Sequence, residues 1–254
     1  MQWRSRKQIV RSLVFFLVSA ALLPALVSGC KTRQDRPEEK NEIKKIEAVK
    51  EKNPDLTVGM CRMLGMLNEY LGRFNHISGK PYAGLVESFG MDEQEIADRF
   101  EEMILAYHQE TGTRFSLKRD PPGSGLVFKS HKLSEIINSF YIVEKGKSVS
   151  GTLDLKVLDA ASENCRLAFV QGAYMRFGLE GANAIRMANG YYKITALAHV
   201  LEGLGCKPVR IYRMETVPMS YVLVFRPTER LKELLPIRRK LRKEELKGYQ
   251  EVKE

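Results

Sequence analysis

The sequence lacks the short motifs that carry catalysis in many enzyme families. Its 254 residues contain no Gly-x-Ser-x-Gly, no His-Glu-x-x-His, no phosphate-binding glycine loop and no Cys-x-x-Cys. The histidines are few, and none has the spacing of a ligand pair: His76, His108, His131 and His199. We therefore expect neither catalysis nor a metal or other cofactor, and the chain is predicted not to be an enzyme.

No apolar run has the length of a membrane-spanning helix. The longest covers residues 13–27, is interrupted by Ser19 and Pro24, and follows four basic residues within the first eleven. This pattern is typical of a signal peptide, with a positive n-region and an apolar h-region. The run ends in Val-Ser-Gly-Cys at 27–30, where small residues precede a cysteine.

This segment resembles the lipobox of bacterial lipoprotein precursors. The resemblance implies a signal peptide over residues 1–29, cleavage between Gly29 and Cys30, and diacylglycerol with fatty acyl chains such as palmitate on Cys30. Two or three acyl chains are enough for stable anchoring. Because Lys31 and not Asp follows, the pattern resembles outer-membrane sorting in a bacterium with two membranes. The expected location is the cell envelope, or the outer face of the cell membrane where there is only one. An uncleaved signal anchor with an incidental cysteine is the alternative.

Lipid attachment can be tested at the cysteine itself. We expect Cys30→Ser to block processing and lipid labelling, because a serine hydroxyl does not replace the thiol in lipid transfer. Metabolic labelling with a radioactive fatty acid measures this. Undiminished label on the variant would refute the lipobox.

Strong charge of one sign is absent once the leader is removed. The whole chain carries +10, and the leader holds four bases and no acids, which leaves +6 from Cys30 onward. This is mild for the length and predicts no nucleic-acid binding. The surplus lies in residues 226–254, with ten Lys/Arg and six Asp/Glu. For the charged C-terminal segment 236–254, three interpretations stay open: a solvated helix end, a surface for anionic lipid headgroups, or a docking helix for an acidic partner.

The region after the leader divides into a tether and a folded part. Residues 30–55 have about one apolar position in three or four, which predicts a charged, lipid-anchored spacer. In the folded part, Cys-Arg is followed by Tyr nine residues after the Cys and by Arg-Phe, both in 58–74 and in 162–178. A Leu-Val-Phe segment also recurs, and chance similarity of amphipathic segments is the alternative to a true repeat.

The repeat predicts an α+β fold with an internal duplication. Repeat unit 1 is expected over 56–150 and repeat unit 2 over 151–235, each in the order helix, helix, strand, strand, helix. Two hairpins then give one antiparallel four-stranded sheet with helices packed on it, a permuted ferredoxin-like core. Gly112 and Gly205 are expected to end helices in the left-handed conformation. Whether the units form one domain or two stays open.

Three cysteines remain after lipidation of Cys30, an odd number. Cys61 and Cys165 occupy matching positions in the two repeats, each beside small residues that permit close helix contact. If the helices meet at a two-fold axis, the two thiols form a candidate disulfide, with Cys206 free. Two buried free thiols are the alternative.

Two further sets of side chains suggest binding. Met60, Met63 and Met66 beside Cys61 are soft ligands that suit Cu(I), but their helical spacing also fits the core, which is the interpretation we adopt. Aromatic residues of the repeated helices predict a ligand cleft: Tyr70, Phe74, Tyr174 and Phe177. The expected function is a membrane-anchored, non-catalytic module that binds a protein partner or scaffolds an envelope assembly. The alternative is a sensor or carrier of a small apolar ligand.

Overall fold

The computed structural model describes residues 56–68, 84–120, 125–145, 149–179, 181–235 and 250–251. The signal peptide, the tether and most of the charged C-terminal segment lie outside these ranges. Within them the fold is α+β with antiparallel sheets, as the sequence predicts. No helix in the described part combines the length and the apolar character needed to cross a bilayer.

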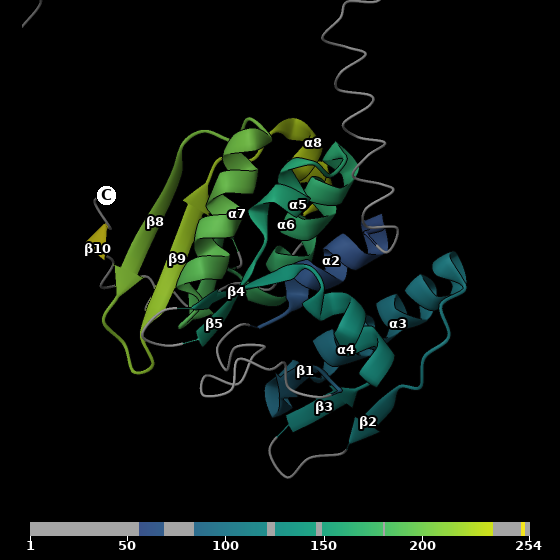
Figure 1. The fold of residues 1–254 in the computed structure, drawn as a ribbon. Helices are drawn as coiled ribbons and strands as arrows, with labels where there is room; N and C mark the ends of the chain where they lie inside the picture. Colours follow the sequence, from purple (N-terminus) through teal and green to yellow (C-terminus); the bar gives the residue numbers. More distant parts are fainter. Residues whose placement is uncertain are drawn as a thin grey trace, which may run out of the picture.

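Two helices lie side by side at the centre of the molecule (Figure 1). They are α2 (Val58–Met66) and α6 (Glu163–Phe177). Each begins at a hydroxyl that accepts a hydrogen bond from a backbone N–H three residues on: Thr57 caps α2, and Ser162 caps α6. Residues that are far apart in the sequence are thereby joined along one seam.

A three-stranded sheet lies on the α2 side. It contains β1 (Leu85–Gly90), β2 (Lys118–Asp120) and β3 (Gly125–Lys129) in the order β1-β3-β2. The short 3-10 helix η1 (Met91–Glu93) and then α3 (Gln94–Thr111) follow β1, and α4 (His131–Asn138) follows β3. Phe89, Phe100 and Phe128 pack ring to ring between this sheet and α3. Helix α3 ends, as predicted, at Gly112 with φ +67°.

A five-stranded sheet lies on the α6 side. Its order is β10-β8-β9-β7-β6, from β6 (Gly178–Leu179), β7 (Ala184–Ala188), β8 (Val209–Met214), β9 (Ser220–Phe225) and β10 (Gln250–Glu251). Helix α7 (Tyr191–Gly203) lies across this sheet in Figure 1, and α8 (Glu229–Leu234) follows β9. Ile185, Leu223 and Ile211 are directly paired and point toward the helices, so the alternating residues point outward.

The same order of elements occurs twice. Each half has the order helix, strand, helix, strand, strand, helix: α2-β1-α3-β2-β3-α4 in the first half and α6-β7-α7-β8-β9-α8 in the second. The three main strands also pair in the same order in both sheets. A hairpin of β4 (Tyr141–Lys145) and β5 (Val149–Leu153), followed by α5 (Leu155–Asp159), connects the halves. One hydrophobic cluster contains residues of both halves. That the halves arose by duplication stays a prediction.

Two details differ from the sequence-based expectation. The hairpins β2–β3 and β8–β9 lie in separate sheets and do not form one four-stranded sheet, so the ferredoxin-like arrangement is wrong. Each half also has a strand between its first two helices, β1 or β7, and this strand pairs with the last strand of its own half. These extra strands complete each half as a sheet of its own.

Candidate functional site: the helix seam and the arginine face

The seam between α2 and α6 is close enough for the two backbones to touch. A Cβ added at Gly65 would lie 2.1 Å from the Phe169 carbonyl oxygen, and one added at Gly172 would lie 2.0 Å from the Arg62 carbonyl oxygen. No side chain larger than hydrogen fits at either position. The small residues that the sequence placed on these helix faces therefore do permit close contact.

These contacts are reciprocal. Gly65 on α2 meets Phe169 on α6, and Gly172 on α6 meets Arg62 on α2, so a shift of 107 residues carries one contact into the other. Such a relation describes a local two-fold axis through the seam. The predicted match of Cys61 with Cys165 uses a shift of 104 residues, so the two cysteines are not equivalent positions about this axis.

A buried arginine joins four elements at the C-terminal end of α2. Arg176 of α6 donates to both carboxylate oxygens of Glu93, at 2.8 and 3.0 Å, and to the backbone oxygens of Met66 and Ser88, each at 2.9 Å. Glu87, itself buried, lies 3.5 Å from the guanidinium. Burial lowers the pKa of Arg176, but Glu87 and Glu93 raise it more, so its pKa is above the ordinary value and the group is charged.

A buried lysine reaches the same helix end from α7. The ammonium group of Lys193 donates to the backbone oxygen of Leu64 and, at 3.4 Å, to that of Leu67, and it lies 5.1 Å from the centre of the Phe169 ring. Lys193 is fully buried. Two cations therefore satisfy carbonyl groups that the helix end leaves without partners of its own.

Two of the three described thiols meet at the other end of the seam. Cys61 and Cys165 lie one helical turn before the contact of Gly65 with Phe169, and the interaction between the two thiols shifts the pKa of both, although their positions are not equivalent. Both are free and buried in this structure, as is Cys206. The candidate disulfide therefore stays a prediction, with its two cysteines on neighbouring turns of the touching helices.

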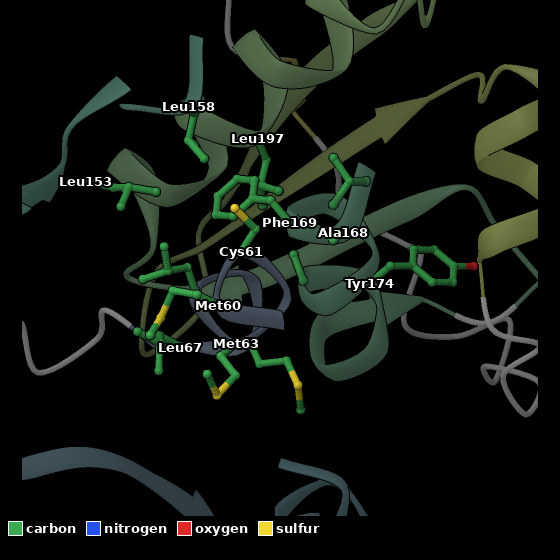
Figure 2. Close-up of a cluster of buried hydrophobic side chains, with 14 of the residues drawn as sticks. Met60, Cys61, Met63, Leu67, Leu153, Leu158, Ala168, Phe169, Tyr174 and Leu197 are labelled. Atoms are coloured by element: carbon green, nitrogen blue, oxygen red, sulfur yellow. The ribbon is translucent and has the colours of Figure 1, made fainter. Parts of the chain in front are cut away.

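The methionines of α2 belong to the core. Met60, Met63 and Met66 are fully buried, and Figure 2 shows Met60, Cys61 and Met63 pointing away from α2 in different directions. The burial of all three methionines supports the core interpretation, and the expected absence of a metal stays a prediction. Among the described residues, no group of three or more His, Cys, Asp or Glu side chains is placed to hold a metal.

Only half of the predicted ligand cleft lies within the described residues. Tyr174 is buried, and its hydroxyl donates to the backbone oxygens of Leu179 and Ala182, at 3.3 and 3.1 Å. Phe177 lies against the Arg176 guanidinium. Tyr70 and Phe74 lie outside the described residues, as do Gly29 and Cys30. Lipid attachment and the envelope location stay predictions.

A cavity of about 300 Å³ lies elsewhere, between the β4–β5 hairpin, α5 and α7. Ile142, Leu153, Tyr192 and Ala196 line it, and Ile142 and Tyr192 are exposed. It does not include any residue of the predicted cleft.

Charge is unevenly distributed between the sheets and the helices that cover them. Strands β7, β8 and β9 contain three arginines and no acidic residue. Helix α3 contains five acidic residues and one arginine, Arg99. On the outward face of the five-stranded sheet, Arg186 lies in a row with Val222 and Tyr212, and Glu251 of β10 pairs with Tyr212 at the end of this row. Val222 is buried in a small apolar cluster on this side, and Arg210 lies in the next row with the exposed Val224.

We compared the chain with known proteins. No family model matches it, and no curated protein matches it. Solved structures of the homing endonuclease I-DmoI are among those that resemble it. Mesophilic variants of I-DmoI share 14% identity over 71% of this chain and 94% of theirs, with a TM-score of 0.46. I-DmoI in complex with DNA and calcium shares 14% identity over 72% of this chain and 95% of its own, with a TM-score of 0.49.

These neighbours contradict several expectations drawn from the sequence. They are structures of a homing endonuclease, and some were solved with DNA. This contradicts the expected function as a non-catalytic envelope lipoprotein and its alternative, a carrier of a small ligand. It also contradicts the expectations that the chain is not an enzyme and that it does not bind nucleic acid. Two of these errors have a clear origin. Missing motifs exclude only the families defined by those motifs, and a mild total charge conceals the separation of acidic α3 from the arginine-bearing strands.

Sequence reasoning also missed both buried cations. The sequence pattern singles out Arg176 only as part of the repeated Arg-Phe, and it does not single out Lys193. The available signal was a basic residue on an otherwise apolar helix face: Lys193 stands between Tyr192 and Ile194 in a helix that contains only one other fully charged residue, Glu202. Their partners lie 83 to 129 residues away in the sequence, beyond the reach of helical periodicity.

Proposed function

We propose that this chain binds double-stranded DNA through the arginine face, which we define as Arg186, Arg210, Tyr212 and Val224 on the outward side of the five-stranded sheet. The observation that carries the proposal is that Arg186 and Arg210 lie on the outward side of β7, β8 and β9, three strands that contain no acidic residue. Arginine is the side chain best suited to contact phosphates and guanine edges. One of the neighbours named above is I-DmoI in complex with DNA. For this chain the proposal rests on the charges of the sheet.

The spacing of the two arginines fits a duplex. Arg186 on β7 and Arg210 on β8 are two strands and two residues apart, which places their Cα atoms about 12 Å from each other. The major groove of B-DNA is also about 12 Å wide and admits β-strands. Val224, 39% exposed, lies between them on the central strand and offers an apolar contact for a thymine methyl group.

One acidic residue, Glu251 of the edge strand β10, pairs with Tyr212, and a larger group of acidic residues lies on α3. The acids of α3 form pairs with Arg119, at 2.7 Å to Asp98 and 2.8 Å to Glu101, and they cover the three-stranded sheet. A polyanion is therefore attracted to one side of the molecule and repelled from α3, which favours a defined orientation on the duplex.

We expect the double variant Arg186→Ala/Arg210→Ala to weaken binding of the full-length chain to duplex DNA at least tenfold at low salt. Each lost phosphate contact also reduces the slope of log affinity against log salt by about 1. Fluorescence anisotropy with a labelled duplex, at several salt concentrations, measures both quantities.

The matched control is Arg99→Ala, which removes one half-exposed arginine on the acidic helix α3. We expect it to leave affinity and salt slope unchanged. Equal affinity and slope for the double variant and the unaltered chain would show that the arginine face does not bind DNA. Tighter binding of single-stranded DNA, RNA or anionic vesicles than of the duplex would also refute the proposal.

A further inference from the structure

Cys61 and Cys165 lie at the start of the seam, where α2 and α6 run in the same direction. The two cysteines each lie one turn before the backbone contact of Gly65 with Phe169, so their side chains are neighbours across the seam, and the Cys165 sulfur is 3.9 Å from the backbone oxygen of Leu56. Cys165 is the third residue of α6, directly beyond the capping Ser162, whose hydroxyl accepts from its backbone N–H. The contact therefore joins the two central helices at a position where one thiol lies in a helix N-terminal turn.

The surroundings of the two thiols differ. The hydrogen bond from Cys61 lowers the pKa of Cys165 from 9.0 to about 6, burial opposes this, and a hydrogen bond with Ser162 supports it. The same hydrogen bond, together with burial, raises the pKa of Cys61. Cys165 is 6% exposed and Cys61 is fully buried. Cys165 therefore has the lower pKa and keeps a small exposed fraction, whereas the fully buried Cys61 thiol stays protonated beside it.

We propose that Cys61 and Cys165 form a peroxide-sensitive dithiol, in which Cys165 attacks a hydroperoxide and Cys61 then closes a disulfide across the seam. The inference does not depend on DNA binding. In the first step the Cys165 thiolate attacks one peroxide oxygen, the O–O bond breaks, and Cys165 sulfenic acid and water form after the leaving oxygen takes up protons. In the second step the Cys61 sulfur attacks the Cys165 sulfur and displaces water. Two thiols lose two electrons, and the peroxide gains them.

The seam makes this closure possible without a large movement. The glycines hold the helix backbones in direct contact, so the two sulfur atoms need only a short approach to form a bond. Cys206 gives an internal comparison, because burial raises its pKa and its hydrogen-bond partner is the backbone of Thr228 rather than a thiol. A small oxidant should therefore react at Cys165 and not at Cys206.

The test uses the reduced full-length chain, one equivalent of hydrogen peroxide, alkylation of the remaining thiols and non-reducing peptide mapping. We expect a linked Cys61–Cys165 peptide pair and an alkylated Cys206. We also expect the rate of Cys165 alkylation by iodoacetamide to rise with a midpoint near pH 6. With Cys61→Ser, a sulfenic acid on Cys165 should be trapped by dimedone. With Cys165→Ser, oxidation of Cys61 should slow at least tenfold.

The matched control is Cys206→Ser, which should form the bridge at the unchanged rate, and far-UV circular dichroism verifies that each variant folds. Should either seam variant fail to fold, the peptide map and the alkylation profile of the unaltered chain decide alone. Preferential oxidation of Cys206, a bridge that involves Cys30, or an alkylation midpoint near pH 9 would overturn the inference.

Discussion

Replacing Gly172 with alanine should be among the most destabilising single changes in this chain. The added methyl group would lie 2.0 Å from the carbonyl oxygen of Arg62, and the obstructing atom belongs to backbone, which cannot rotate away. The helices must therefore separate along the seam on which both halves pack. We expect a loss of about 3–5 kcal/mol in the free energy of unfolding, at or above the upper end for overpacked cores. Guanidinium denaturation followed by far-UV circular dichroism measures it.

Gly203→Ala is the matched control, since Gly203 also lies in a helix, α7. There the nearest foreign atom to an added Cβ is Nη1 of Arg166 at 3.6 Å, an ordinary contact. Alanine favours the helix by about 0.5–1 kcal/mol, so stability should stay equal or rise slightly. If Gly172→Ala proves as mild as this control, the helices do not touch as the structure places them.

The second large effect is expected at Arg176. Arg176→Met keeps the apolar stem but removes the only described cation within 4 Å of the buried Glu87, and it leaves the Met66 carbonyl without this donor. Removing one partner of a buried ion pair costs about 3–5 kcal/mol, and the backbone N–H groups of Asn68 and Ser88, which still donate to Glu87, place the expected loss at the lower end of this range. Arg176→Lys should recover little of this, because one ammonium group cannot replace the planar fork that contacts Glu93, Met66 and Ser88 together.

A double-mutant cycle isolates the charge in this effect. Arg176→Met/Glu87→Gln removes both members of the pair, and it should be more stable than Arg176→Met alone by at least about 1 kcal/mol. Strictly additive losses would mean that Glu87 and Arg176 do not interact, and that the arginine stabilises the fold through its other partners, Glu93 and the backbone oxygens of Met66 and Ser88. Denaturation curves of the four proteins under identical conditions give the coupling energy.

The sequence predicted those features that depend on local spacing. The α+β class, the glycines that end α3 and α7, and the small-residue faces of α2 and α6 all follow from helical periodicity and glycine chemistry, and the structure confirms them. The predicted order of helices and strands is also nearly right. The prediction omits only the strand between the first two helices of each half, β1 or β7.

The errors come from features that periodicity does not determine. The repeat was aligned with a shift of 104 residues, whereas the contacts of Gly65 and Gly172 require 107. Three residues are nearly one helical turn, so both alignments place small residues on similar helix faces. Only the observed contacts between the helices show which of the two alignments is correct. Strand β7 was hidden because its two buried central residues, Ile185 and Met187, alternate over too short a run to be distinguished from the following helix.

The parallel course of α2 and α6 has an electrostatic consequence. Each helix carries a partial negative charge of about half an elementary unit at its C-terminal end, and two ends that point the same way repel each other. Arg176 and Lys193 place two positive charges against the carbonyl end of α2, inside the core, where dissolved ions do not reach. Salt should therefore weaken the binding of a polyanion to the exposed arginine face and have almost no effect on the packing of the two halves against each other.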